Sequence, residues 1–472
     1  MSRRTGSRRL AGALLTAGLF GGCSGTGDGK EGAAGTGDTA RDTALARAAD
    51  ACPDTSAGLR LPEGFCATVF ADSLGKARHV AVSSTGDVYV TLEGTEPSPE
   101  KQAAGETQQR QPAAVVALRD TSRDGRADVV ERIPGVGNTG VRIHDGWLYV
   151  DAGERIVRHR MQPGVLAPAG EPETIVRDVP LEPGHRARNF AIGPDGGLYL
   201  NIGSISNSCQ LNDREEGSRG MDPCTELETR AGLWRFDANT PDQRVTRAAR
   251  WATGIRNGMG LAFHPASGQL YATQHGRDQL RANWPRVFPD WKYSAQNPGE
   301  ELLVVNRGDV FGWPYCYYDM EAKRLVTAPE YGGNGKRTDR CADKKAPLAV
   351  YPAHWAPMDL LFYDGRQFPE RYRGGAFIAF HGSWNRAPEP QAGYRVVFQP
   401  MRDGRPQGEF ETFADGFAGL PPEQVQPGSA KHRPVGLAAG PDGSLYVTDD
   451  AGGRVYRITY GAAADGAGPR GR

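Results

Sequence analysis

The sequence of 472 residues has few aromatic side chains and no excess of either charge. Phe, Trp and Tyr make up 8% of it, and 56 Lys and Arg balance 56 Asp and Glu. This balance gives no sign of a nucleic-acid-binding face or of an acidic tail. A heptad seam and a long amphipathic helix are also missing. In contrast, 63 Gly and 34 Pro are present, so we expect a mostly β protein with many turns.

Cysteine is scarce and lacks the spacing of metal or haem sites. Seven cysteines are present without Cys-x-x-Cys or Cys-x-x-Cys-His, which argues against a zinc site and a fused c-type haem. Apart from Cys23, they form three local pairs, as expected of disulfides in an exported protein, although sequence alone does not choose the connectivity. The neighbour pairs are Cys52/Cys66, Cys209/Cys224 and Cys316/Cys341.

The first 22 residues resemble a bacterial lipoprotein signal. Four arginines precede an apolar run at 10–20, and two glycines precede Cys23. The run is too short to span a bilayer. We therefore expect Cys23 to be lipidated and the protein to be anchored to a bacterial membrane on its extracytoplasmic side. The alternative is an ordinary cleaved signal and a secreted or periplasmic protein.

Residues 23–51 are small, polar and free of aromatic side chains. Such a composition cannot bury a core, so we expect a flexible tether there. We expect a second flexible tail at 461–472. The folded part is therefore predicted to span 52–460.

A short strand motif recurs within 52–460. In each copy a turn with glycine precedes an apolar strand, usually with Tyr at its centre. Units too small to bury their own faces, repeated at blade-like spacing, are typical of a β-propeller. We expect an all-β, six-bladed propeller with long loops at one rim, in which 67–70 joins the last blade and closes the ring. A β-sandwich pair is the alternative. The copies lie at 86–90, 146–150, 196–200, 268–272, 375–379 and 443–447.

One copy of this motif differs because it opens with His-x-x-Arg. In 185–203, His185 and Arg188 come directly before a strand, and the turn Pro194-Asp195-Gly196 leads into a second strand. This pattern predicts a tight hairpin with the histidine at the rim of a sheet. Arg256-Asn257 and Arg433 also precede apolar strands. The planar fork of arginine suits a carboxylate or a reacting oxygen.

Together these motifs resemble the soluble pyrroloquinoline-quinone (PQQ)-dependent sugar dehydrogenases, the glucose/sorbosone dehydrogenase group, from about Leu61 to Tyr460. The family is built on a six-bladed propeller, which agrees with the repeat count. The segment 381–386, HGSWNR, is similar to the sorbosone dehydrogenase branch. The motifs that carry the resemblance are His185 with Gly-Pro-Asp-Gly, 254–257 (GIRN), Gly276 in QHG, Glu301 with FGWP, and 433–437 (RPVGL).

The resemblance implies a role for each matching residue. His185 would be the general base on a sugar hydroxyl while hydride moves to the quinone. Arg256 would contact the reacting oxygen of the quinone, and Asn257 would be a neighbouring cofactor ligand. Arg433 would hold a cofactor carboxylate. The redox chemistry would belong to the cofactor and its orientation to the protein.

The resemblance also implies calcium. The main-chain carbonyls of Gly276 and Arg277 match those that hold a cofactor-bound calcium ion, which requires oxygen ligands. Glu300 and Glu301 match acidic residues of a second, structural calcium site.

Several positions depart from the family pattern. Val435 replaces a second arginine expected near Arg433, and 204–207 has no counterpart of an expected glutamine. The segment 381–386 stands where a lysine is expected. Arg188, Arg186 or Arg386 are the candidates that would replace the missing cations.

A loop at 120–131 has the acidic spacing of a calcium-binding loop around Gly125. Strands are predicted on both sides of it, so it is not an EF-hand, and a solvated hairpin turn is favoured.

We therefore expect a PQQ- and calcium-dependent dehydrogenase that oxidises a sugar or a related alcohol or aldehyde. Electrons would pass to a separate acceptor because no haem motif is present. The alternatives are a non-catalytic propeller that binds carbohydrate or protein, and a calcium-dependent lactonase-type hydrolase.

Overall fold

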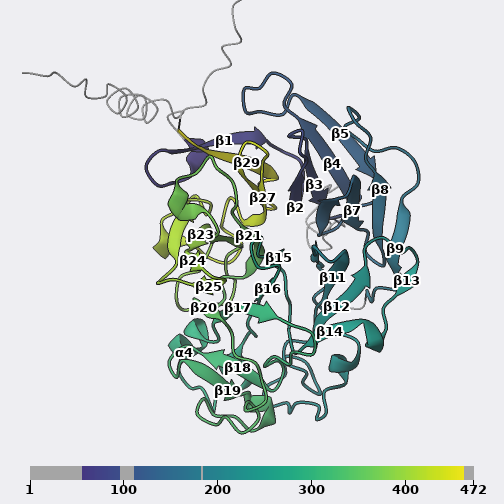
Figure 1. Cartoon of the computed structure of the whole chain (residues 1–472). Helices are drawn as coiled ribbons and strands as arrows, with labels where there is room; N and C mark the ends of the chain where they lie inside the picture. The colour runs from purple at the N-terminus through teal and green to yellow at the C-terminus, as the bar shows by residue number, and fades with distance from the viewer. Residues whose placement is uncertain (1–55, 96–110, 182–183, 462–472) are drawn as a thin grey trace, which may run out of the picture. The chain divides into compact units, whose positions relative to one another are not determined.

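The computed structural model describes residues 56–95, 111–181 and 184–461. The chain divides into two units, Met1–Ala44 and Leu45–Arg472, and every described residue belongs to the second. In that unit six sheets of four or five strands are arranged as the blades of a β-propeller (Figure 1). The predicted fold class is confirmed.

The first three strands of each blade follow one another along the chain. Blade II also takes the edge strand β13 from the segment between β12 and β14, and the last blade includes a strand from the other end of the folded part. Blade I contains β2 (Ala77–Val82), β3 (Val88–Leu92), β4 (Ala114–Arg119) and β5 (Val129–Pro134). Blade II contains β6 (Val141–His144), β7 (Trp147–Asp151), β8 (Ile156–Arg160), β9 (Glu173–Arg177) and the parallel edge strand β13 (Gln243–Arg244). Blade III contains β10 (Phe190–Ile192), β11 (Gly197–Ile202), β12 (Gly232–Asp237) and β14 (Arg250–Thr253).

The other three blades have the same order. Blade IV contains β15 (Leu261–Phe263), β16 (Leu270–Gln274), β17 (Glu300–Val305) and β20 (Ala349–Tyr351). Blade V contains β21 (Pro357–Phe362), β22 (Ala376–Phe380), β23 (Arg395–Gln399) and β26 (Glu411–Ala414). Blade VI contains β27 (Pro434–Ala439), β28 (Leu445–Asp449), β29 (Arg454–Tyr460) and β1 (Phe65–Ala71).

Short elements occupy the connections between these strands. Two hairpins pair β18 (Cys316–Asp319) with β19 (Arg324–Thr327) and β24 (Met401–Arg402) with β25 (Arg405–Pro406). The α-helices of the described residues are α3 (Leu280–Asn283) and α4 (Trp291–Gln296). The 3-10 helices are Ser56–Gly58, Thr225–Glu228, Arg247–Ala249, Pro329–Tyr331, Glu370–Tyr372 and Pro422–Gln424.

The recurring sequence motif forms the second strand of every blade. The strands β3, β7, β11, β16, β22 and β28 are buried along their whole length apart from Trp147, which is half-buried. Each lies inside its sheet and between two neighbouring blades, so both of its faces contact apolar side chains. The first strands of successive blades contact one another around the ring, and β27 of the last blade contacts β2 of the first.

The ring is closed by a strand from the beginning of the folded part, as predicted. β1 pairs antiparallel with β29, from Phe65 opposite Tyr460 to Ala71 opposite Val455. The Phe65 ring also makes edge-to-face contacts with Phe368 and Phe413. The pairing covers an edge of blade VI that would otherwise expose free N–H and C=O groups.

Two of the expected turns have the predicted form. Between β10 and β11, Gly193 N–H donates to the Gly197 carbonyl, and Gly196 has a φ of +70°. In the acidic loop before β5, Asp120 accepts from the main-chain N–H groups of Arg123 and Gly125. Its carboxylate therefore stabilises the turn itself, which supports the hairpin interpretation over a calcium loop.

Long insertions at one rim carry the disulfides. Cys209–Cys224 closes the loop after β11, and Cys316–Cys341 anchors the β18–β19 hairpin. Both predicted pairs are confirmed, whereas Cys52, the expected partner of Cys66, lies outside the described residues. Cys23, the signal and the flexible segments also lie outside them. Within the described part of the chain, no helix is long and apolar enough to cross a membrane.

Candidate active site

The chemistry-bearing residues meet where each first strand begins and each second strand ends. Because β10 and β11 are antiparallel, with Phe190 opposite Leu200, these two points lie at the same end of the blade. His185 precedes β10 and Ser204 follows β11, and the His185 main-chain N–H donates to the Ser204 carbonyl at 3.0 Å. The equivalent loops of the other blades reach the same face of the propeller.

The imidazole of His185 is held by one of its two nitrogens. Nδ1 lies 2.9 Å from the Ser204 carbonyl oxygen, so this nitrogen carries the proton and donates. Nε2 has no hydrogen-bond partner among the described residues. Burial, with the neighbouring positive charge of Arg256, lowers the pKa of His185. His185 is therefore neutral near pH 7, with a free lone pair on Nε2.

Arg256 is a buried guanidinium on the loop before β15. Its Nε donates to the main-chain carbonyl of Asn207 at 3.0 Å, and its Nη1 donates to the carbonyl of Gly276 at 2.9 Å. Its Nη2 contacts the side-chain oxygen of Asn207 at 3.0 Å and the carboxylate of Asp278 at 3.1 Å. The cation is therefore fixed by two loops, one after β11 and one after β16.

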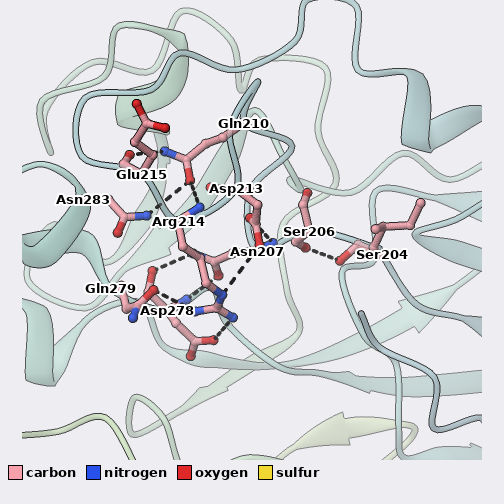
Figure 2. Close-up of polar contacts among 12 residues, drawn as sticks. Ser204, Ser206, Asn207, Gln210, Asp213, Arg214, Glu215, Asp278, Gln279 and Asn283 are labelled. Atoms are coloured by element: carbon pink, nitrogen blue, oxygen red, sulfur yellow. Dashed lines mark hydrogen bonds and ion pairs between the residues drawn. The ribbon is translucent and has the colours of Figure 1, made fainter. Parts of the chain in front are cut away.

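The carboxylate of Asp278 contacts side chains from three different loops of this face. One carboxylate oxygen accepts from Arg256 and from Arg214, each at 3.1 Å, and Asn385 donates to the other at 2.6 Å. Figure 2 shows the contacts of Asp278 with Arg214 and Asn207. Burial opposes ionisation, but Arg256, His354 and Arg214 keep the pKa of Asp278 below its usual range. Asp278 is thus an anion that offsets the charge of Arg256.

Asn257 lies beside Arg256 in a second polar group. Its side-chain oxygen accepts from Asn201 at 3.3 Å, and its amide nitrogen lies 3.4 Å from His275 Nδ1. Nε2 of His275 lies 2.9 Å from the Pro357 carbonyl. Burial is the main reason why the pKa of His275 falls to about 4, so this second histidine is also neutral.

A further charged cluster is formed by residues of blades V, VI and I. His381 Nε2 lies 2.8 Å from one carboxylate oxygen of Asp450, and Arg78 Nη1 contacts the other oxygen at 2.5 Å. Arg433 donates to the carbonyls of His381 and Gly382 at 3.1 and 2.8 Å. Burial lowers the pKa of His381 itself. When protonated, His381 would lower the pKa of His275, as the charge of Arg256 does. The two clusters therefore lie within electrostatic range of each other.

Two of the expected compensating arginines are held by main-chain carbonyls. Arg188 donates to the carbonyls of Gly153 and Pro180, next to blade II. Arg386 donates to the carbonyls of Ala295 and Ala353. Val435 is fully buried and packs with Met259 and Met358. Arg186 is exposed. Arg78 and Arg433 both lie within electrostatic range of Asp450 and lower its pKa.

The four residues expected at calcium lie together near the end of β16 and the start of β17. The Gly276 carbonyl accepts from Arg256, while the Glu300 carboxylate accepts from the main-chain N–H groups of Gly276 and Ala356 at 2.8 and 3.1 Å. Glu301 accepts from Gln274 at 2.7 Å, and the side chain of Arg277 pairs with Glu330.

Their charges do not form a ready cation site. Burial raises the pKa of Glu300 to about 7 and that of Glu301 to about 8. Among residues 56–95, 111–181 and 184–461, no group of three or more His, Cys, Asp or Glu side chains could hold a metal ion.

Sequence reasoning missed Arg78, Asp278, Asp450 and Asn207. Asp278 lies two residues after the QHG motif, and Asp450 is the last residue of the TDD sequence. Both come after the second strand of a blade, and this position could have marked them as candidate site residues. Arg78 and Asn207 had none, because their roles depend on partners far away in the sequence.

The fold is a six-bladed propeller, and one of its faces carries a neutral histidine and several buried arginines. Residues 59–461 match the family model described as TrAA12-like. The chain therefore belongs to the TrAA12-like family, and the resemblance to PQQ-dependent sugar dehydrogenases is confirmed.

A curated relative agrees with this assignment. The chain is 29% identical over 288 residues to the pyrroloquinoline quinone-dependent pyranose dehydrogenase of Coprinopsis cinerea. That match covers 53% of this chain and 38% of the relative, so the chain spans well under half of that protein's length.

Solved structures share the fold at low identity. A Trichoderma reesei protein of Carbohydrate-Active Enzymes Family AA12 superposes with a TM-score of 0.66 at 18% identity, over 85% of this chain and 98% of the other. The PQQ domain of the Coprinopsis cinerea pyranose dehydrogenase, in its holo form, gives 0.64 at 19% identity, over 85% and 97%.

Proposed function

We propose that this chain is a PQQ-dependent sugar dehydrogenase in which His185 is the general base. The observation that carries the proposal is the neutral imidazole of His185, whose proton is on Nδ1 and whose Nε2 is free beside the buried guanidinium of Arg256. A base and a fixed cation at one site suit the removal of a hydroxyl proton next to a developing charge.

The donor set at this face fits an anionic, planar quinone. PQQ carries carboxylate groups and quinone oxygens, which guanidinium groups bind well. Arg78 and Arg433 flank Asp450, and Nε of Arg78 lies 3.5 Å from a carboxylate oxygen of Glu93. These two arginines would hold carboxylates, and Arg256 with Asn257 would meet the reacting end of the cofactor.

The residues of the chain would then divide the work. The bound quinone would supply the hydride acceptor. Nε2 of His185 would take the proton of the sugar hydroxyl, and the Ser204 carbonyl would stabilise the imidazolium through Nδ1–H. Arg256 would stabilise negative charge on the oxygen that it faces, while Asp278 keeps its guanidinium in place. The substrate class is a pyranose or a related polyol.

Calcium is the second cofactor that we propose. The carbonyls of Gly276 and Arg277 would contribute hard oxygen ligands, and the cofactor's own oxygens would complete the shell. Glu300 and Glu301 remain candidates for a structural ion. Their high pKa values predict that such an ion would displace protons on binding.

Cofactor titration tests the proposal. Purified protein without its first 22 residues would be titrated with PQQ in the presence of calcium, and binding followed by quinone absorbance and by thermal stabilisation. We expect saturable binding that Arg256→Ala weakens strongly. Arg235→Ala is the control, because Arg235 pairs with Asp195 at the β10–β11 turn, at the other end of the blade. A wild-type protein that does not bind PQQ would exclude the proposal.

We also propose that the enzyme is exported, lipidated on Cys23 and held at the extracytoplasmic side of a bacterial membrane. A separate electron acceptor would then reoxidise the cofactor outside the cytoplasm. The basis is the signal-like sequence that ends at Cys23. Labelling with a fatty-acid analogue should mark the wild-type chain and not Cys23→Ser. Label on both proteins would show that another residue is lipidated, and label on neither would show that the protein is not lipidated.

A further inference from the structure

Asn207 makes an unusually complete set of contacts on this face. It is 1% exposed and lies in the loop after β11. Its side-chain oxygen accepts from Arg256 Nη2 and from the main-chain N–H of Asp278, at 3.0 and 2.8 Å, and its amide donates to the Asp278 carbonyl at 3.0 Å. Its own carbonyl accepts from Arg256 Nε and from Trp313 Nε1, both at 3.0 Å.

Two of these contacts form a reciprocal pair. The Asn207 amide and the Asp278 main chain exchange a donor and an acceptor, as two paired strands do, and so join the loop after β11 to the loop after β16 (Figure 2). The pair leaves the side chain little rotational freedom. Only an amide of this length supplies the donor and the acceptor together.

The loop that carries Asn207 is itself rigid. The main-chain N–H groups of Ile205 and Ser206 donate to the buried carboxylate of Glu226, at 2.7 and 3.2 Å. Ser206 Oγ accepts from Cys209 N at 2.8 Å, and Cys209 is in a disulfide with Cys224. Asn207 therefore acts as a fixed point against which another side chain can be held.

The side chain held in this way is Arg256. A guanidinium has five N–H groups, and Nε, Nη1 and Nη2 of Arg256 make four contacts within the described residues. Two of the four go to Asn207. One N–H of Nη1 remains for a ligand. Its direction is set by the plane of the guanidinium, and Asn207 contacts that plane along the edge formed by Nε and Nη2.

We propose that Asn207 is the positioning residue for Arg256: it fixes the plane of the guanidinium so that a single N–H points at the bound cofactor or reacting oxygen. The identity of the group that this N–H meets rests on the proposed function. The contacts by which Asn207 holds Arg256 do not depend on it. Displacement of the guanidinium should lower the reaction rate much more than it lowers the stability of the protein. A shift of about 1 Å in a catalytic group lowers the rate on the order of a hundredfold.

The test is a double-mutant cycle between Asn207→Ala and Arg256→Ala, with PQQ affinity and kcat as readouts. We expect Asn207→Ala alone to lower kcat about a hundredfold and to weaken PQQ binding about tenfold. In the Arg256→Ala background the same change should alter either quantity less than about twofold. Equal losses in both backgrounds would overturn the proposal, because Asn207 would then act independently of Arg256.

Asn212→Ala is the matched control. Asn212 is an exposed asparagine of the same loop, and its only polar contacts among the described residues are those of its main chain. It should retain wild-type affinity and rate. Asn207→Asp keeps the acceptor oxygen but loses the donor to Asp278, so its kcat should lie between those of wild type and Asn207→Ala. An Asn207→Asp as impaired as Asn207→Ala would contradict a role through the acceptor oxygen.

A cofactor-free measurement separates this inference from the proposed function. Crystal structures of wild-type protein and Asn207→Ala without PQQ should show one ordered orientation of the Arg256 guanidinium in the first and a displaced or multiple orientation in the second. An unchanged guanidinium in Asn207→Ala would overturn the inference even if PQQ binds. Failure of wild-type protein to bind PQQ would overturn the function and leave this structural test intact.

Discussion

The proton of the His185 imidazole is placed by Ser204. Nδ1 of His185 lies 2.9 Å from the Ser204 carbonyl oxygen and 3.1 Å from its hydroxyl oxygen, and that hydroxyl donates to the Ser206 carbonyl at 2.7 Å. Both Ser204 oxygens are therefore acceptors toward Nδ1, which must carry the proton. The fold thereby selects Nε2 as the nitrogen that can remove a proton.

Replacing His185 by alanine should remove this base and leave the cofactor site intact. We expect kcat to fall about a hundredfold to ten-thousandfold, the usual contribution of a general base, with PQQ affinity changed little. Steady-state rates with an artificial acceptor and PQQ titration measure the two quantities. His144→Ala is the control, because His144 lies at the β6–β7 turn, outside the site. A His185→Ala enzyme with wild-type kcat would assign the base to another group.

Protonation of His185 should begin to lower the activity only at a pH well below neutrality. Burial and the charge of Arg256 lower the pKa of His185, while Asp278 opposes them. A lowered pKa means that the imidazole stays neutral and competent until the pH falls far below the ordinary histidine value of about 6.5. We expect kcat/KM to stay flat from about pH 8 to below pH 6, with circular dichroism confirming that the protein remains folded. A fall centred near 6.5 would show an unshifted histidine.

The fold could be predicted from the sequence because its information is local and repeated. Each second strand must be apolar on both faces, and each begins after a turn with glycine, so the six copies are visible one by one. The strand at 67–70 was also expected to join the last blade and close the ring. The sequence motifs also predict His185, Arg256 and Arg433 as site residues.

The arrangement of the charged groups could not be predicted, because it depends on contacts between distant blades. Arg78 and Asp450 are 372 positions apart, and nothing in the sequence around Arg78 distinguishes it from a strand residue. Arg188 shows the reverse case. It stands next to the histidine in the sequence, but its side chain turns toward blade II and contacts the Gly153 carbonyl.

Arg78→Gln should weaken PQQ binding. The change removes a charged donor beside Arg433 while keeping a polar side chain next to Asp450, which still contacts His381 at 2.8 Å. A charged hydrogen bond is worth about 1.5–3 kcal/mol, so we expect the Kd to rise about tenfold to a hundredfold in the same absorbance titration. Arg119→Gln is the control, since Arg119 pairs with Asp87 at the opposite end of blade I. Equal Kd values for Arg78→Gln and wild type would exclude Arg78 from the cofactor site.

Asp151→Asn should change how stability depends on pH. Asp151, at the end of β7, is fully buried, and burial raises its pKa from 3.8 to about 6 against the charge of Arg188 and hydrogen bonds from Gly153, Thr139 and Asn138. Between these two values the folded protein keeps a proton that the unfolded chain releases. The free energy of unfolding contributed by Asp151 therefore falls as the pH rises through this window, by up to about 3 kcal/mol.

Asparagine does not titrate, so the variant should lack this part of the slope. Urea unfolding of both proteins at pH 4, 5, 6 and 7 measures it, and the stability of Asp151→Asn relative to wild type should increase across the series. The control is Asp145→Asn, a change at an exposed turn position, which should run parallel to wild type. Parallel curves for Asp151→Asn as well would mean that this carboxylate is already ionised at pH 4 in the folded protein, stabilised by the N–H groups that contact it.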